Sequence, residues 1–197
     1  MPYQWRNLTP AEREKLLAFR KRLRRPWHRP PHFGGGSVHY HLTAACYEHK
    51  PIIGHSPERL EEFTNELLNA LPIEPAAWCI LPNHYHLLIR CDDLKNMTRT
   101  LGQLHGRLSF RWNGEDGTRG RKVWYSVADR AMRGSEHYWA TLNYIHHNPV
   151  KHGYTDNWLD WPFSSAQDYL NEVGRAEAIK IWKNFPILDY GKGWDDL

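Results

Sequence analysis

The stretch "ILPNHYHLLIR", residues 80–90, decides how the rest of the chain is interpreted. An apolar run stops at Pro82-Asn83, a pair that favours a turn, and resumes at Leu87. His84 and His86 lie between them. Residues two apart on a strand share a face at a separation of about 7 Å, so both imidazoles can reach one cation. The pattern predicts a tight hairpin that carries either a metal-binding pair or two hydrogen-bonded structural histidines.

Strand and helix patterns alternate along the rest of the chain. Strands are predicted at 37–48, 75–82, 84–91 and 122–132, and helices at 56–71, 96–113 and 135–148, the last stopped by Pro149. This order predicts an α+β fold of the ferredoxin-like (split β-α-β) type, an antiparallel sheet with helices on one face. We expect an N-terminal basic helix and a C-terminal extension in addition. "HYH" at 39–41 repeats the histidine spacing and is interpreted as structural.

Length and composition indicate a folded globular protein. The chain has 197 residues, of which 41% are hydrophobic and 24% charged. We expect three parts: a basic arm over 1–35, a main domain over 36–170 and an extension over 171–197. No apolar run approaches the roughly 20 residues that span a bilayer, and no apolar segment follows the start, so we expect no membrane association and a cytoplasmic location. The three cysteines are predicted to be small core residues: Cys46, Cys79 and Cys91.

Charge is distributed unevenly along the chain. Residues 1–32 contain 9 Lys/Arg and 2 Asp/Glu, whereas residues 154–197 contain 4 Lys/Arg and 8 Asp/Glu. A basic arm on a neutral body favours a polyanionic partner such as nucleic acid, although a solvated helix face would have the same composition. The candidate phosphate contacts are Arg20, Arg22, Arg24, Arg25 and Lys151.

A second group of polar residues lies in "LNYIHHNPVKHGY", residues 142–154. Tyr144 and Asn148 are one helical turn apart on a polar stripe, and Asn148 precedes Pro149 at the expected helix end. A phenol can attack phosphorus if a metal ion polarises the phosphate. The alternative on this stretch alone is a tyrosine with its hydroxyl at the surface.

Taken together, the motifs "LPNHYHLLI", "VWYSVADRAM", "NYIHHNPVKHGY" and "DWPFSSAQDYL" resemble the single-tyrosine HUH transposases, and most closely the REP-associated tyrosine transposases. The resemblance covers roughly residues 36–170. It implies that His84 and His86 bind Mg²⁺ or Mn²⁺ and that Asn148 completes the metal site. It also implies that Tyr144 attacks single-stranded DNA to form a 5′-phosphotyrosine link. The implied substrates are hairpin-forming repeats, and their rejoining reverses the reaction.

The predicted function is therefore a metal-dependent single-stranded DNA endonuclease and transesterase that mobilises hairpin-forming repeat DNA. The family that the motifs resemble usually has a plainly hydrophobic residue between the two histidines, and here that residue is Tyr85, which strand alternation points to the opposite face. Three alternatives remain open: an inactive hairpin-DNA-binding regulator, a nuclease that activates water, and a non-catalytic protein with a structural metal. The expected partners are single-stranded and hairpin DNA in the nucleoid. Monomer and homodimer are both compatible with the sequence.

Overall fold

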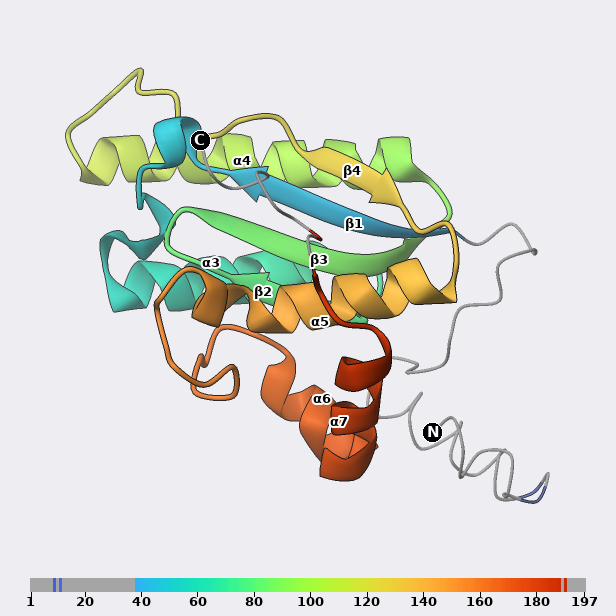
Figure 1. Cartoon of the computed structure of the whole chain (residues 1–197). Helices are drawn as coiled ribbons and strands as arrows, with labels where there is room; N and C mark the ends of the chain where they lie inside the picture. The colour runs from blue at the N-terminus through green and yellow to red at the C-terminus, as the bar shows by residue number, and fades with distance from the viewer. Residues whose placement is uncertain (1–8, 10, 12–37, 189, 191–197) are drawn as a thin grey trace.

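The computed structural model describes residues 9, 11, 38–188 and 190 (Figure 1). The predicted N-terminal helix and its arginines lie outside the described residues. The elements, in chain order, are β1 Val38–Ala45, η1 Tyr47–His49, η2 Ile53–His55, α3 Pro57–Ala70, β2 Ala77–Ile80, β3 His84–Cys91, α4 Leu94–Glu115, β4 Ala128–Ala131, α5 Ser135–Lys151, α6 Ala166–Val173 and α7 Arg175–Asn184.

The four strands form one antiparallel sheet in the order β2-β3-β1-β4. β1 and β3 lie side by side at its centre (Figure 1). Along the chain, α3 connects β1 to β2, and α4 connects β3 to β4. This β-α-β-β-α-β order with a 2-3-1-4 sheet is the ferredoxin-like arrangement, so the predicted fold class is confirmed.

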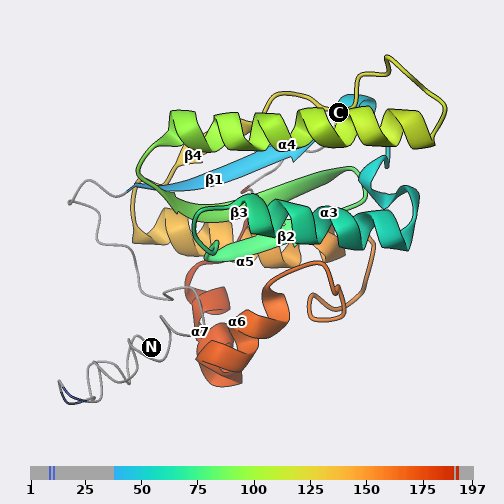
Figure 2. The same cartoon turned by 180° about the vertical axis from the view of Figure 1, so that it is seen from behind.

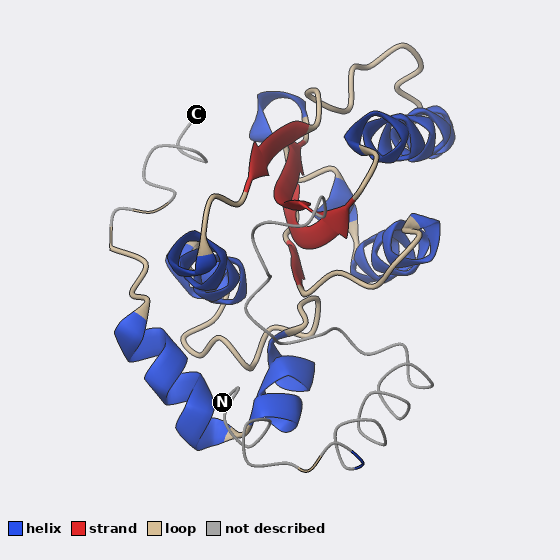
Figure 3. Cartoon of the chain, turned by 90° about the vertical axis from the view of Figure 1, so that its right-hand side faces the viewer, coloured by secondary structure: helices blue, strands red, loops and turns tan. Residues whose placement is uncertain are grey.

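Helices cover both faces of the sheet. Tyr85, Leu87 and Ile89 of β3 pack with the apolar stripes of α3 and α4, which lie together on one face (Figure 2). Leu88 packs on the other face with Leu142 and Ile145 of α5, which lies across the sheet from α3 and α4 (Figure 3). The prediction of helices on one face therefore holds for α3 and α4 but is wrong for α5. β3 is buried on both sides, so each face needs a cover.

The structure moves several predicted boundaries: β1 ends at Ala45 rather than at residue 48, and the end of α5 and the start of β4 also differ. α5 does not stop at Pro149 but continues to Lys151. The missing proline N–H removes only one hydrogen bond near the helix end, and the last turn is closed by the bond from Tyr154 N–H to Pro149 O, 2.9 Å. β4 is restricted to Ala128–Ala131, and upstream of it only Trp124 pairs with the sheet, through an isolated bridge to Cys46.

The remaining composition-based expectations concern cysteines and membrane spans. All three cysteines are buried and free of disulfides, as predicted: Cys46, Cys79 and Cys91. Within the described ranges, no helix combines the length and apolar character that crossing a membrane requires.

A buried ion pair joins the start of α3 to the end of α4, and it predicts a pH-dependent stability. Arg59 and Asp116 have side chains only 8% and 9% exposed. Arg59 donates two hydrogen bonds to Asp116, and Arg121 donates a third at 2.7 Å. Arg59 and Arg121 hold the pKa of Asp116 well below its usual range. Asp116→Asn is expected to lower the free energy of unfolding by roughly 3 kcal/mol, because it leaves the buried guanidinium of Arg59 with only the half-exposed carboxylate of Glu115, 3.1 Å away, as its counter-charge.

Denaturant unfolding at several pH values checks this prediction. Because the folded-state pKa lies below the unfolded value of about 3.9, the contribution is complete above roughly pH 4 and is lost as pH falls further. Asp92→Asn is the control, since Asp92 pairs with Arg90 at 3.4 Å on the surface, where both side chains are more than half exposed. Equal effects of the two substitutions at pH 7 would contradict the assignment.

Candidate active site

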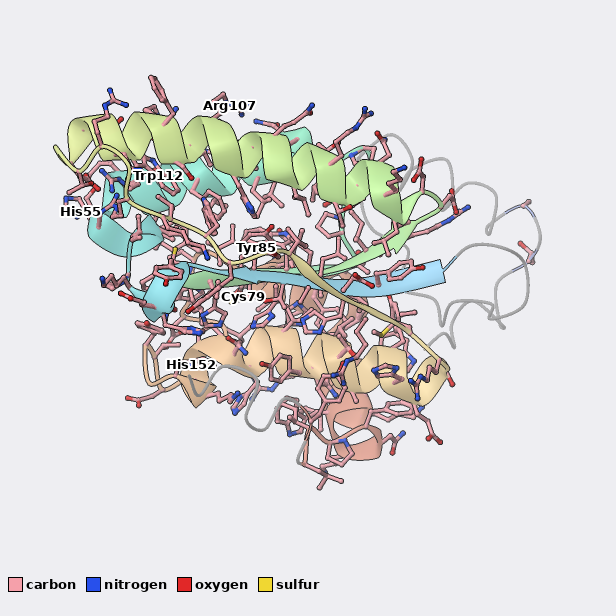
Figure 4. All side chains as sticks on the ribbon, turned by 90° about the horizontal axis from the view of Figure 1, so that it is seen from above. His55, Cys79, Tyr85, Arg107, Trp112 and His152 are labelled. Atoms are coloured by element: carbon pink, nitrogen blue, oxygen red, sulfur yellow. The ribbon has the colours of Figure 1, made fainter. Side chains whose placement is uncertain are left out.

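β3 presents His84 and His86 to the face covered by α5. Their ring centroids lie 4.9 Å apart at an interplanar angle of 80°, and the two side chains are 2% and 0% exposed. The predicted alternation places the intervening Tyr85 on the α4 side, where its hydroxyl lies 3.1 Å from Nε2 of His105. Figure 4 shows Tyr85 on the α4 side of the sheet. Burial raises the pKa of Tyr85, which disfavours its use as a nucleophile.

Asn83 fixes the orientation of the first histidine. Its Nδ2 donates to the His49 carbonyl at 3.1 Å, so its Oδ1 is the atom that accepts a hydrogen bond from Nδ1 of His84, at 2.8 Å. A neutral imidazole carries one N–H, so Nε2 of His84 then presents a lone pair.

That lone pair faces α5. Nε2 of His84 lies 3.1 Å from Oδ1 of Asn148, and both side chains are buried. The amide Nδ2 of Asn148 has no hydrogen-bond partner in the part of the chain that the structure describes. Nε2 of the neutral imidazole and the amide Oδ1 both carry lone pairs, so both atoms could coordinate one cation placed between them. Nε2 of His84 and Oδ1 of Asn148 therefore fit as ligands of a divalent ion.

His41 orients the second histidine. Its Nε2 lies 3.0 Å from Nδ1 of His86, so Nε2 of His86 is the nitrogen that would bind a cation. The β1–β3 register pairs Thr43 with His86. His41 is two residues before Thr43 on β1, so its side chain lies on the same face of the sheet as that of His86. The interpretation of "HYH" at 39–41 as structural overlooked this contact. The repeated two-residue spacing was the available signal.

Tyr144 lies over the histidines from α5. Its ring centroid is 5.3 Å from that of His86 and 5.9 Å from that of His41, and the side chain is 1% exposed. A surface tyrosine is therefore excluded. Asn148 follows one turn later, within the helix rather than at a frayed end, and Lys151 comes one turn after that, with Nζ 5.3 Å from the Tyr144 ring centroid. A single chain thus brings together Tyr144, His84, His86 and Asn148.

The C-terminal segment adds a tyrosine that sequence reasoning missed. The Tyr190 ring lies 5.4 Å from that of Tyr144, and its hydroxyl contacts Thr141 and His137. A cavity of about 470 Å³ opens beside Tyr144 and Lys151, between α5, α7 and this segment. No local pattern marked residue 190, because its role depends on a contact with a helix 46 positions earlier.

The other histidines near Tyr144 divide between the core and the site. His146 is 2% exposed and bonds Oγ of Ser165 at 2.9 Å, so it belongs to the core. The His152 ring lies 5.0 Å from that of His84, at the end of α5 (Figure 4). Among the described residues, no set of three His, Cys, Asp or Glu side chains is placed to hold a metal. A metal here would rely on the amide of Asn148 and leave positions open for substrate oxygens.

Residues 36–148 match the family described as "Transposase IS200 like". The chain belongs to this transposase family. It is 34% identical over 152 residues to a putative REP-associated tyrosine transposase of Haemophilus influenzae, covering 62% of this chain and 82% of that protein. It is 31% identical over 127 residues to the REP-associated tyrosine transposase of Escherichia coli K12, covering 62% and 69%. The resemblance inferred from the motifs is thereby confirmed.

One solved structure supports the same fold. It is described as a REP-associated tyrosine transposase bound to a REP hairpin, and it matches with a TM-score of 0.51 at 23% identity, covering 74% of this chain and 86% of that one. The IS200-like match ends at residue 148, so it includes Tyr144 and Asn148 but not α6 and α7. The predicted three-part division stays a prediction. The predicted boundary at 170 lies within α6.

Proposed function

We propose that the protein is a single-stranded DNA transesterase that cuts and rejoins hairpin-forming repeat DNA through a 5′-phosphotyrosine on Tyr144. One observation carries the proposal: β3 and α5 bring His84, His86, Tyr144 and Asn148 into one buried cluster within a single chain. The names of the relatives, which associate them with REP sequences, and the hairpin bound to the structural neighbour support the choice of substrate. The proposed biological outcome is transposition or mobilisation of such repeats.

We further propose Mg²⁺ or Mn²⁺ as the cofactor, held by His84, His86 and Asn148. Support comes from the buried imidazole and amide acceptors that face each other at 3.1 Å, and from the separate partners that orient the two rings. When bound, a divalent ion would polarise the scissile phosphate and offset negative charge on its oxygens. Because imidazole and amide ligands are neutral, they do not offset the positive charge of such an ion.

Tyr144 supplies the nucleophile in this scheme. Its phenolic oxygen forms a bond to phosphorus while the bond from phosphorus to the 3′ oxygen breaks. The phenolic proton passes, directly or through water, to the departing 3′ oxygen. The strand that keeps the phosphate stays esterified to Tyr144, and a 3′-OH reverses the step with the same bonds exchanged. Lys151 lies close enough to Tyr144 to attract the phosphate, which agrees with its predicted DNA contact.

Strand cleavage of end-labelled DNA tests the proposal. The substrates are single-stranded hairpin oligonucleotides from repeats beside the gene, with Mn²⁺ or with EDTA. The proposal predicts that the 5′-labelled product migrates freely and that the 3′-labelled product stays with denatured protein, only when metal is present. Two free products would favour the water-activating nuclease, and binding without cleavage would favour the regulator.

The contact between His41 and His86 predicts a graded effect on metal binding. His41→Phe is expected to lower Mn²⁺ affinity about 10- to 100-fold, because His86 loses the partner that fixes its ring and tautomer. Calorimetric titration of Mn²⁺ measures this. His39→Phe is the matched control: it lies on the same strand and face, but its ring packs against Tyr138, 5.3 Å away. Equal affinities for the two variants would contradict an orienting role.

A further inference from the structure

A group of aromatic and cationic side chains lies at the end of the sheet where β3 begins. We call it the stacking platform: Tyr47 and His49 of η1, with Lys122 and Tyr125 from the loop between α4 and β4. The Tyr47 and Tyr125 rings are 5.1 Å apart, and Nζ of Lys122 lies 4.4 Å and 5.4 Å from their centroids. The His49 ring lies 6.0 Å from that of Tyr125. The two segments meet at one end of the molecule (Figure 1).

The backbone holds this platform in place. Tyr47 N–H donates to Val123 O at 2.7 Å, and Tyr125 N–H donates to Ala45 O at 2.9 Å. Glu48 N–H reaches the Tyr125 hydroxyl at 3.4 Å. Glu48 and His49 both have positive φ, 55° and 50°, a conformation that disfavours residues with a Cβ. Such conformations persist where surrounding contacts enforce them, and they recur at ligand-binding sites.

Asn83 connects the platform to the candidate metal site. Its carbonyl accepts from Cys46 N–H at 2.7 Å, immediately before Tyr47. Its side chain bonds the His49 carbonyl with one atom and Nδ1 of His84 with the other. One side chain thus separates a platform residue from His84. A polymer whose phosphate reaches His84 would pass its neighbouring nucleotides close to these rings.

The chemistry of the platform matches a nucleotide. Tyr125 is 40% exposed and offers a face for stacking, and Lys122 is exposed beside it. Within the described residues Lys122 forms no ion pair with a carboxylate, and the nearby Glu48 is neutralised by Lys50 at 2.6 Å. An exposed aromatic ring close to an ammonium group suits a base and its phosphate, without preference for a particular base.

We propose that the stacking platform binds the unpaired DNA strand that leads to the scissile phosphate, with a base on Tyr125 and a phosphate on Lys122. This rests on the proposed function, because it names how the substrate of that same site is held. In this proposal the η1 segment and the α4–β4 loop position the substrate. The double-stranded hairpin would bind elsewhere on the protein, without contacts to the stacking platform.

Equilibrium binding tests the proposal without chemistry. Fluorescence anisotropy in a Tyr144→Phe background compares a blunt hairpin with the same hairpin carrying eight thymidines on its 5′ or its 3′ side. The extension on one side is expected to tighten binding, and Tyr125→Leu or Lys122→Gln to reduce that gain about 5- to 50-fold while blunt-hairpin affinity is unchanged. Tyr125→Trp should retain the gain. Lys95→Gln, an exposed lysine at the far end of α4, controls for net charge.

No gain from either extension, or a gain that survives Tyr125→Leu and Lys122→Gln, would overturn the proposal. Photocrosslinking gives a second readout, with 5-iododeoxyuridine placed in turn at each extension position. The expected adducts fall on Tyr47 or Tyr125. Adducts on Trp182 instead would place the strand in the cavity between α5 and α7, and would also overturn it. Neither assay involves cleavage, so the two proposals can fail separately. If the platform binds the extension but the unmutated protein does not cleave the strand, the proposed function is wrong and the platform proposal still holds.

Discussion

Tyr144→Phe is expected to abolish both strand cleavage and the covalent protein–DNA product. The substitution removes the attacking oxygen and keeps the ring that packs against His86 and Tyr190, so the surrounding side chains retain their neighbours. Binding of the hairpin and of Mn²⁺ should therefore be close to that of the unmutated protein. Denaturing gels with labelled hairpin DNA measure both products.

Tyr154→Phe is the matched control for this prediction. Tyr154 is 42% exposed and its ring lies 6.4 Å from that of His152, so it is near the site but outside the cluster around His84. This variant should cleave normally. Cleavage that persists at the normal rate in Tyr144→Phe would favour activated water as the nucleophile.

His86→Ala is expected to reduce Mn²⁺ affinity more than about 100-fold and to abolish cleavage, because it removes one of the two imidazoles proposed as metal ligands. The expected loss exceeds that for His41→Phe, which removes an orienting partner and keeps the ligand. Calorimetry for Mn²⁺ and the cleavage assay check the two effects separately. His55→Ala, at an exposed histidine in η2, should change neither (Figure 4).

The comparison of His86→Ala with Tyr144→Phe also separates the two roles. His86→Ala should lose both metal binding and cleavage. Tyr144→Phe should lose cleavage but still bind the metal. Normal cleavage by His86→Ala at low Mn²⁺ would contradict the assignment of His86 as a ligand.

The local parts of the site were predictable because they follow from strand and helix periodicity. The structure gives β3 the bounds His84–Cys91 that the hairpin pattern predicted. Alternation placed Tyr85 on the side opposite the two histidines, and one helical turn placed Asn148 beside Tyr144. These relations depend only on residues close in the sequence.

The parts that the sequence missed depend on contacts between distant segments. His41 meets His86 across 45 positions, and only the β1–β3 register makes them neighbours. The role of Asn83 required knowing that its amide nitrogen is occupied by the His49 carbonyl. The sequence pattern predicts a helix stop at Pro149, but near the end of α5 the proline costs a single hydrogen bond and the helix continues to Lys151. The predicted arginine contacts of the N-terminal arm stay predictions.

In the proposed function, one chain supplies every residue assigned to the site. Tyr144 lies over histidines of its own chain, so the cluster needs no residue from a second copy. The proposed stacking platform would extend the same single-chain site toward the unpaired DNA.

The most direct test of the central claim is mass spectrometry of the covalent product. The protein is incubated with a hairpin oligonucleotide and Mn²⁺, denatured, and digested with protease and nuclease. The account predicts a nucleotide linked through its 5′ phosphate to the peptide that contains Tyr144, and no such product when EDTA replaces Mn²⁺. A nucleotide on a peptide that contains Tyr85, Tyr154 or Tyr190, or cleaved DNA with no modified peptide, would contradict it.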